Sequence, residues 1–383
     1  MTTPYTILII GEWNSKNLGD NLLCSTYERL LKSLFPEAKT IRFDISSKSG
    51  VSALKQFPGK VLFKLSSYIP FLKPFAQNYH NFILEYSIKR ILCRILSKKG
   101  NYIAAVAGGA LVQDYFAISL NTIGEILEKH NVPIIYNAIG VGNIKKEESK
   151  EIFRKLLTRK NIKSISARDN LKELNFTHLP IKHIPDVAIC CSQFYHITKP
   201  TEKIIGFGIL NPSFYINNSK DNAILTENDY KKYIVDVIKK IQKDTNLPIQ
   251  IFSNGAMDDY LYAQNIKKEI ASPYITVAPR PKNEKELVLL INSFSYVIAN
   301  RLHALILAYS FNIPTYGILW DFKVKYWHDF IQSQEYGHLS SLLKTNIASL
   351  INQSQVSREK KEELTKQIIL NIKNGITHSL YSI

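Results

Sequence analysis

Short apolar runs alternate with segments of helical periodicity along most of this 383-residue chain. Runs at 6–10, 102–107 and 133–139 consist almost entirely of apolar residues, which is typical of strands buried on both faces of a parallel sheet. The first unit reads as strand, polar loop and helix, with Asp20 predicted as the N-cap of that helix. Further strands are expected at 164–167, 203–209, 248–252, 275–278, 296–299 and 314–319, and helices at 145–160, 228–243, 258–270, 284–292 and 357–374.

The order of these elements predicts the domain organisation. Strands that alternate with helices in two successive halves indicate an α/β fold of two Rossmann-like domains, with the carboxyl ends of both sheets facing a cleft. A polar stretch at 192–203 marks the boundary between the halves. We therefore expect an N-terminal domain at 1–195, a C-terminal domain at 196–345 and a helical tail at 346–383.

One segment of the first half differs in character from the rest. Residues 52–100 combine phenylalanine and tyrosine with basic residues, among them Lys60, Lys64, Lys89 and Arg90. Basic amphipathic helices of this kind bind anionic membrane surfaces. The alternative, which the pattern slightly favours, is one or two helices that cover the sheet while their long basic side chains reach solvent.

The net charge of the chain indicates which classes of binding partner it favours. Its 49 Lys and Arg residues against 32 Asp and Glu give a net charge of +17, which favours phosphate-bearing substrates, nucleic acid or an anionic membrane. A solvated basic surface is the alternative. No nucleic-acid-binding motif is present, so no nucleic acid is expected. The four cysteines form no paired C-x-x-C motifs, so no zinc site is expected. Their usage, together with the lack of a signal peptide and of a membrane-spanning segment, predicts a cytoplasmic protein.

Familiar catalytic signatures are missing from the sequence. It has no G-x-S-x-G, H-E-x-x-H, P-loop or complete G-x-G-x-x-G motif, so common hydrolases and dinucleotide enzymes are disfavoured, and neither a cofactor nor a metal is expected. Polar or glycine-rich clusters instead follow the predicted strands, where each is either part of a binding site or an ordinary turn or cap. The clusters contain Asn17, Gly19 and Asp20; Gly108 and Gly109; Arg168 and Asp169; Asn254; Arg301, Leu302 and His303; and Asp321 and Lys323.

The corner at 300–304 is the most informative of these clusters. The strand at 296–299 delivers Arg301 and His303 to the first turn of a predicted helix. An anion bound there would meet a guanidinium fork, an imidazole and the free N–H groups of the helix start. The alternative for the histidine is a structural hydrogen bond. Clusters at six strand ends favour a substrate site.

Taken in order, the motifs N-x-G-D, G-G, A-R-D, P-D (Pro185-Asp186), R-L-H-A and W-D-x-K resemble those of the polysaccharide pyruvyl transferase family. The resemblance runs over about residues 11–323, and R-L-H-A with the following A-x-x-x-x-x-P and D-x-K is its most specific part. Ala110 stands where the family often has a third glycine, and Asn170 where it often has an acidic residue. The resemblance implies a glycosyltransferase-B-like pair of domains and transfer of pyruvate from phosphoenolpyruvate to sugar hydroxyls as a ketal.

The resemblance also implies roles for individual residues. Arg168 and Arg301 are expected to clamp the phosphate and carboxylate of phosphoenolpyruvate, the donor substrate. His303 is expected to protonate the methylene carbon of the enol and to take a proton from the attacking hydroxyl. Asp20 is expected near the acceptor or at the helix cap, and Lys323 near an anion or Asp321. The acceptor would be a sugar, an oligosaccharide or a lipid-linked precursor of a surface polysaccharide, which is compatible with attachment to the inner face of the membrane.

Two other classes of function remain open at this point. A glycosyltransferase with a nucleotide-sugar donor would use the same scaffold, because a basic cleft suits a diphosphate equally well. A non-catalytic protein that binds anions or nucleic acid would also explain the charge.

Overall fold

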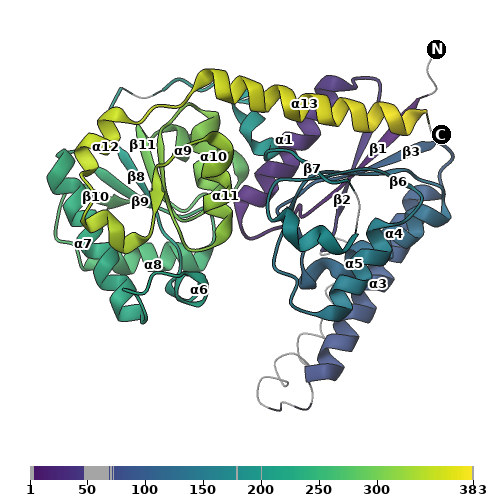
Figure 1. Ribbon diagram of the computed structural model, residues 1–383, viewed down its shortest axis with the longest axis horizontal. Coiled ribbons are helices and arrows are strands. Elements are labelled where there is room, and N and C mark those ends of the chain that lie inside the picture. Colours follow the sequence, from purple (N-terminus) through teal and green to yellow (C-terminus); the bar gives the residue numbers. More distant parts are fainter. Residues whose placement is uncertain are drawn as a thin grey trace. The chain divides into compact units, whose positions relative to one another are not determined.

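The computed structural model describes residues 4–46, 69, 71, 73–177, 180–199 and 201–381. The chain forms two compact units (Figure 1). Unit 1 contains residues 1–14, 27–184 and 368–383, and unit 2 contains residues 15–26 and 185–367. The chain thus passes from unit 1 to unit 2 at 184/185, close to the polar stretch that the sequence marks as a boundary.

Unit 1 is built on a parallel sheet with the strand order β2-β1-β3-β5-β6-β7, and β4 pairs with β5. The strands predicted at 6–10, 102–107, 133–139 and 164–167 are confirmed as β1, β3, β5 and β6. Continuous apolar runs do not mark β2, β4 and β7, because β2 alternates polar with apolar residues and β4 and β7 have only three and two residues. The strands are β1 (Tyr5–Gly11), β2 (Lys39–Asp44), β3 (Asn101–Val106), β4 (Ala110–Val112), β5 (Ile134–Val141), β6 (Ile162–Ala167) and β7 (Lys182–His183).

Helices cover both faces of this sheet (Figure 1). One face carries α3 (Lys73–Leu96), α4 (Ala117–Lys129) and α5 (Glu147–Leu157), whose apolar sides join the core around Leu8, Val106 and Ile139. The C-terminal part of α13 (Arg358–Leu380) lies on the other face. The predicted helix at 357–374 is therefore confirmed. Of the basic aromatic segment at 52–100, residues 52–68, 70 and 72 lie outside the described part of the chain.

A buried polar contact fixes the C-terminal part of α13 on the sheet. The side-chain amide of Asn371 donates to Asn137 Oδ1 at 2.6 Å and to Ser166 Oγ at 3.0 Å. Polar groups that are buried and paired in this way specify one register of packing, because a shifted helix would leave them unsatisfied.

Unit 2 is built on a second parallel sheet, with the order β10-β9-β8-β11-β12-β13. All five strands predicted in this half are present. The neighbouring residues Cys190 and Cys191 are buried, and burial raises the pKa of the Cys190 thiol to about 12. The elements are η4 (Val187–Phe194), β8 (Ile205–Gly208), α6 (Pro212–Asn218), α7 (Glu227–Thr245), β9 (Ile249–Phe252), α8 (Met257–Lys268), β10 (Ile275–Val277), α9 (Glu284–Asn292), β11 (Tyr296–Ala299), α10 (Leu302–Ser310), β12 (Thr315–Ile318), α11 (Phe322–Ile331), β13 (Tyr336–Gly337) and α12 (Ile347–Gln353).

The strand order identifies the ligand-binding edge of each sheet. In unit 2 the order reverses between β8 and β11, and the last residues of these strands, Gly208 and Ala299, are paired in register. Open α/β sheets bind ligands beyond the carboxyl ends of the strands at such a reversal. The Asn300–His303 corner begins at this point. In unit 1 the reversal lies between β1 and β3, and Gly108 and Gly109 follow β3.

Candidate functional site

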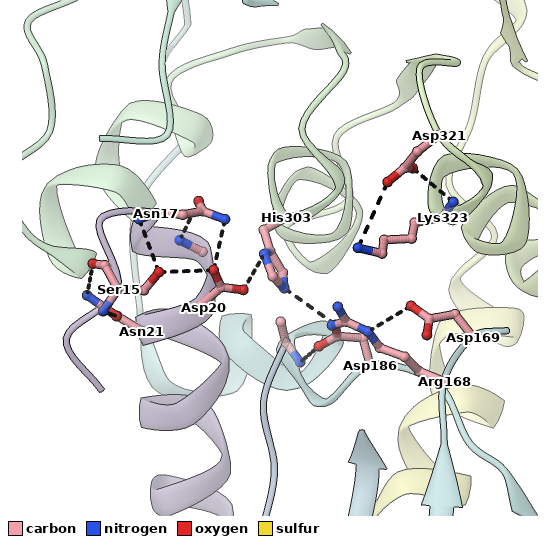
Figure 2. A network of polar contacts seen from close by, with 12 residues as sticks. Ser15, Asn17, Asp20, Asn21, Arg168, Asp169, Asp186, His303, Asp321 and Lys323 are labelled. Carbon is pink, nitrogen blue, oxygen red and sulfur yellow. Dashed lines mark hydrogen bonds and ion pairs between the residues drawn. The ribbon is translucent and has the colours of Figure 1, made fainter. Parts of the chain in front are cut away.

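His303 lies between two carboxylates of unit 2 (Figure 2). It occupies the first turn of α10, where it is 5% exposed. Its Nδ1 is 3.6 Å from Asp20 Oδ1, and its Nε2 is 3.6 Å from Asp186 Oδ2. Both separations are ion-pair distances, slightly longer than a hydrogen bond. The two carboxylates therefore attract the positive charge that the imidazole gains on protonation.

Each carboxylate uses its other oxygen to fix its own loop. Asp186 Oδ1 accepts a hydrogen bond from the Ala188 N–H at 2.8 Å and so caps η4. Asp20 Oδ2 accepts from Ser15 Oγ at 3.2 Å and from Asn17 Nδ2 at 3.1 Å. The Asp186 side chain is 2% exposed and the Asp20 side chain 17%. The Nε2 atom of the imidazole thus faces a buried carboxylate, and the Nδ1 atom faces a partly exposed one.

The start of α1 (Leu18–Leu34) differs from the prediction in one respect. The helix begins at Leu18, and the side-chain oxygen of Asn17 accepts a hydrogen bond from the Gly19 N–H at 3.2 Å. The prediction of Asp20 as N-cap is therefore wrong. Asn17 takes the capping position because its side chain reaches a free N–H of the first turn, which leaves one Asp20 oxygen to face His303.

Gly19 is required by close packing against His303. A Cβ atom at position 19 would lie 2.6 Å from both Cγ and Nδ1 of the imidazole. Non-bonded carbon atoms normally approach to about 3.5 Å. The glycine predicted from the N-x-G-D motif therefore allows α1 to bring Asp20 to the imidazole.

Arg301 has a carboxylate partner that the sequence did not indicate. Its Nε and Nη2 donate to Asp259 Oδ2 at 2.9 and 2.6 Å. Asp259, in the first turn of α8, is 0% exposed, and its Oδ1 accepts from the Asn211 N–H at 2.9 Å. The pair joins the start of α8 to the start of α10 and fixes the direction of the guanidinium.

The starts of α8 and α10 also lack side-chain caps. The flanking residues Ala256 and Arg301 make no capping hydrogen bond. Nearby, the side-chain amides of Asn254 and Asn300 are buried, and within the described part of the chain neither the nitrogen nor the oxygen of either amide has a hydrogen-bond partner. Unpartnered buried polar groups are costly, so these amides and free N–H groups form a polar environment suited to a ligand with anionic or hydrogen-bonding groups.

Lys323 follows the predicted strand at 314–319 and lies in the first turn of α11. Its Nζ is 3.9 Å from Asp321 Oδ2, and its N–H donates to Asp321 Oδ1, the N-cap of the helix, at 2.9 Å. Of the two partners expected for Lys323, an anion or Asp321, the structure contains the second. The Trp320 indole N–H donates to the Asn300 carbonyl at 2.7 Å, which joins this loop to the α10 corner.

Arg168, Gly108 and Gly109 belong to unit 1. Arg168 is 6% exposed, and its Nε is 3.3 Å from Asp169 Oδ2. A Cβ at Gly140 on β5 would collide with the Gly109 carbonyl, so the G-G segment packs closely against that strand. The joint action of Arg168 and Arg301 on one donor, and substrate contact of the glycines, stay predictions.

Two residues of this environment were missed as site residues by sequence reasoning. Asp186 stands in the P-D motif, which marks its position but not its contact with His303. Asp259 carries no sequence signal, because its partner Arg301 lies 42 residues further along the chain. Across the described ranges, no group of three or more His, Cys, Asp and Glu side chains is arranged to hold a metal ion.

Solved structures with a similar fold include two that contain bound nucleotides. S. aureus MnaA in complex with UDP matches with a TM-score of 0.56 at 9% identity, over 100% of this chain and 98% of that chain. The UDP-GlcNAc 2-epimerase of Neisseria meningitidis bound to UDP-GlcNAc matches with a TM-score of 0.52 at 10% identity, over 98% and 99%. At these identities the similarity defines the fold, which is the two-domain GT-B fold of glycosyltransferases and epimerases.

The family is defined by the sequence itself. The family model of polysaccharide pyruvyl transferases matches residues 17–322, which include the corner at 300–304 and both carboxylates that face His303. The chain therefore belongs to the polysaccharide pyruvyl transferase family, and the protein is a transferase. A search of curated protein sequences found no significant match.

Proposed function

We propose that this protein transfers the pyruvyl group of phosphoenolpyruvate to two hydroxyls of a sugar in a surface polysaccharide or its lipid-linked precursor. In this reaction a proton adds to the methylene carbon of the enol, which becomes a methyl group. The adjacent carbon becomes electron-poor and is attacked by one sugar hydroxyl. Phosphate then leaves, the second hydroxyl closes the ketal, and the two hydroxyl protons pass to the base and to solvent.

The position of His303 between Asp186 and Asp20 carries this proposal. A residue that first gives and then takes a proton needs a group that holds its ring in one orientation. Asp186 is suited to this task because it is buried and fixed by the Ala188 N–H. Proton exchange with the substrates would then occur at Nδ1, on the side of the more exposed Asp20.

The starts of α8 and α10 supply the proposed donor site. Phosphoenolpyruvate carries a phosphate and a carboxylate, and Arg301 offers a planar set of N–H donors already oriented by Asp259. The uncapped helix starts add N–H groups with positive partial charge. The side-chain amides of Asn254 and Asn300 would gain their missing partners from the bound donor.

The test compares wild type with His303→Gln. Phosphate release from phosphoenolpyruvate is measured with a panel of p-nitrophenyl glycosides as acceptors, and we expect a loss of about a hundredfold or more. In D2O the methyl group of the product should carry one deuterium. Near-normal turnover of the variant would overturn the role of His303.

Donor identity is tested separately by thermal stabilisation. Phosphoenolpyruvate should raise the unfolding temperature of wild type, because a ligand that binds only the folded state stabilises it. Stabilisation by UDP-GlcNAc without stabilisation by phosphoenolpyruvate would favour a nucleotide-sugar glycosyltransferase and overturn the proposed reaction.

A further inference from the structure

Helix α3 of unit 1 buries one side and exposes an unusual opposite side. Its apolar residues Ile88 and Leu92 are fully buried, and Leu84, Ile91 and Ile95 pack against the same core. These positions recur at spacings of three and four residues, as expected for one face of a helix. The opposite face carries Phe75, Phe82 and Tyr86, whose exposed fractions are 64%, 64% and 45%.

The three aromatic residues form one stripe. At about 100° per residue, Phe75, Phe82 and Tyr86 fall within about 40° of one another around the helix axis. Phe71, just before the helix, is 70% exposed. In the described part of the chain, no other helix carries more than one exposed large aromatic side chain. The stripe is therefore a specific feature of α3 and not the scattered apolar exposure that all proteins show.

Basic residues continue this face toward the C-terminal end of α3. Lys89 and Arg90 follow one turn after Tyr86 and are exposed, and Arg94 is exposed one turn further on. Glu85 is the only acidic residue between 73 and 100, and it pairs with Lys89 at 3.3 Å. The exposed face thus has an aromatic half and a basic half. In Figure 1 the N-terminal end of α3 projects beyond its neighbours α4 and α5.

We propose that the exposed face of α3 docks on the surface of an anionic lipid bilayer. Aromatic side chains insert at the level of the lipid headgroups, and neighbouring lysine and arginine side chains pair with anionic lipids. The net charge of +17 supports the same partner, and it opposes self-association through this face because two copies would bring like charges together. Among the described residues, none of the helices has both the length and the apolar character of a membrane span.

The inference does not depend on the proposed reaction. If the reaction also holds, docking would place the enzyme at the surface where a lipid-linked sugar acceptor resides. Because the aromatic stripe shares no residue with the site around His303, the two proposals can fail independently.

The experiment measures flotation of the full-length protein with lipid vesicles. Two variants alter the face, Phe75→Ser/Phe82→Ser in the aromatic half and Lys89→Glu/Arg90→Glu in the basic half. Matched controls alter exposed residues of unit 2, Leu225→Ser/Tyr274→Ser and Lys239→Glu/Lys243→Glu. Vesicles contain phosphatidylcholine alone or mixed with phosphatidylglycerol, and circular dichroism verifies the fold of each variant.

We expect wild type and both controls to float with phosphatidylglycerol vesicles, and both α3 variants to partition about tenfold less. Added salt should weaken binding of wild type more than that of Lys89→Glu/Arg90→Glu. Equal flotation of the α3 variants and the controls, or no flotation of wild type, would overturn the proposal. A lower sedimentation mass of the α3 variants would identify a second copy as the occupant, and displacement of vesicles by single-stranded RNA would identify nucleic acid.

Discussion

The imidazole of His303 packs directly against the backbone of Gly19, with no room for a side chain between them. A Cβ at position 19 would lie 2.6 Å from the Cγ and Nδ1 atoms of the ring. This contact places Asp20, the next residue, at 3.6 Å from the same Nδ1. The first turn of α1 therefore determines which group the Nδ1 side of the imidazole meets.

Gly19→Ala should displace the imidazole and reduce turnover. Because shifts of about 1 Å in a reacting group cost up to about a hundredfold, we expect a loss of phosphate release of at least about tenfold. Gly375→Ala is the control for adding a methyl group to a buried helical glycine away from His303, where the nearest side-chain atom is that of Ile135 at 3.0 Å. Equal activity of the two variants would mean that the position of His303 is not critical.

Asp186→Asn should change the pH dependence of the reaction. The amide oxygen can still accept from the Ala188 N–H, so the cap of η4 is kept while the negative charge beside Nε2 is lost. Protonated imidazole then becomes less favourable. We expect the alkaline limb of the kcat profile to move to lower pH, with kcat reduced about tenfold or more.

The control for this prediction is Asp221→Asn. Asp221 is a buried aspartate of unit 2 that accepts hydrogen bonds from Tyr215 and Ser340. It should lower stability without moving the pH profile. The positioning role of Asp186 would be refuted by a profile that keeps its shape in Asp186→Asn.

Asp259→Asn should weaken donor binding through Arg301. The variant removes the charge that orients the Nε and Nη2 donors, so we expect KM for phosphoenolpyruvate to rise about tenfold with a smaller change in kcat. Arg301→Lys should raise KM similarly, because a point charge replaces the planar fork.

The double variant tests whether the two residues act together. Asp259→Asn should raise KM less in an Arg301→Lys background than in wild type. The reason is that the effects of substitutions at two residues of one ion pair are not additive. A fall in KM for Asp259→Asn would show instead that the carboxylate mainly weakens donor binding by neutralising the positive charge of Arg301.

His328 should make the protein less stable in acid. The imidazole is 0% exposed, and neither ring nitrogen has a hydrogen-bond partner among the residues that the structure describes. Burial lowers its pKa to about 4. The unfolded chain binds this proton first as the pH falls below about 6.5, so stability is lost between pH 6.5 and 4, by about 3 kcal/mol in total.

His328→Leu should abolish this loss of stability in acid. Urea denaturation at a series of pH values should show the variant gaining about 3 kcal/mol relative to wild type between about pH 7 and about pH 4. The exposed His130→Gln is the control, with no such gain. A constant difference between His328→Leu and wild type at all pH values would contradict the buried neutral state.

The strands were predictable wherever burial on both faces leaves a continuous apolar run. This holds for β1, β5 and β11, whose residues are almost all buried. It fails for β2, whose sequence Lys-Thr-Ile-Arg-Phe-Asp alternates polar with apolar residues, and for β13, which has two residues. The order of the strands in each sheet is a long-range property that no local pattern contains.

The sequence by itself determined which residues follow the carboxyl ends of the strands. It therefore identified the site residues Asn17, Gly19, Asp20, Arg301 and His303. It could do so because glycine, polar and charged residues interrupt the apolar pattern where a chain leaves the sheet. Only the tertiary structure decided which of these side chains meet. Residues 20, 186 and 303 come together through the packing of α1, η4 and α10. The corner at 300–304 is thus recognisable from sequence, whereas its carboxylate partners depend on contacts between distant segments that only folding creates.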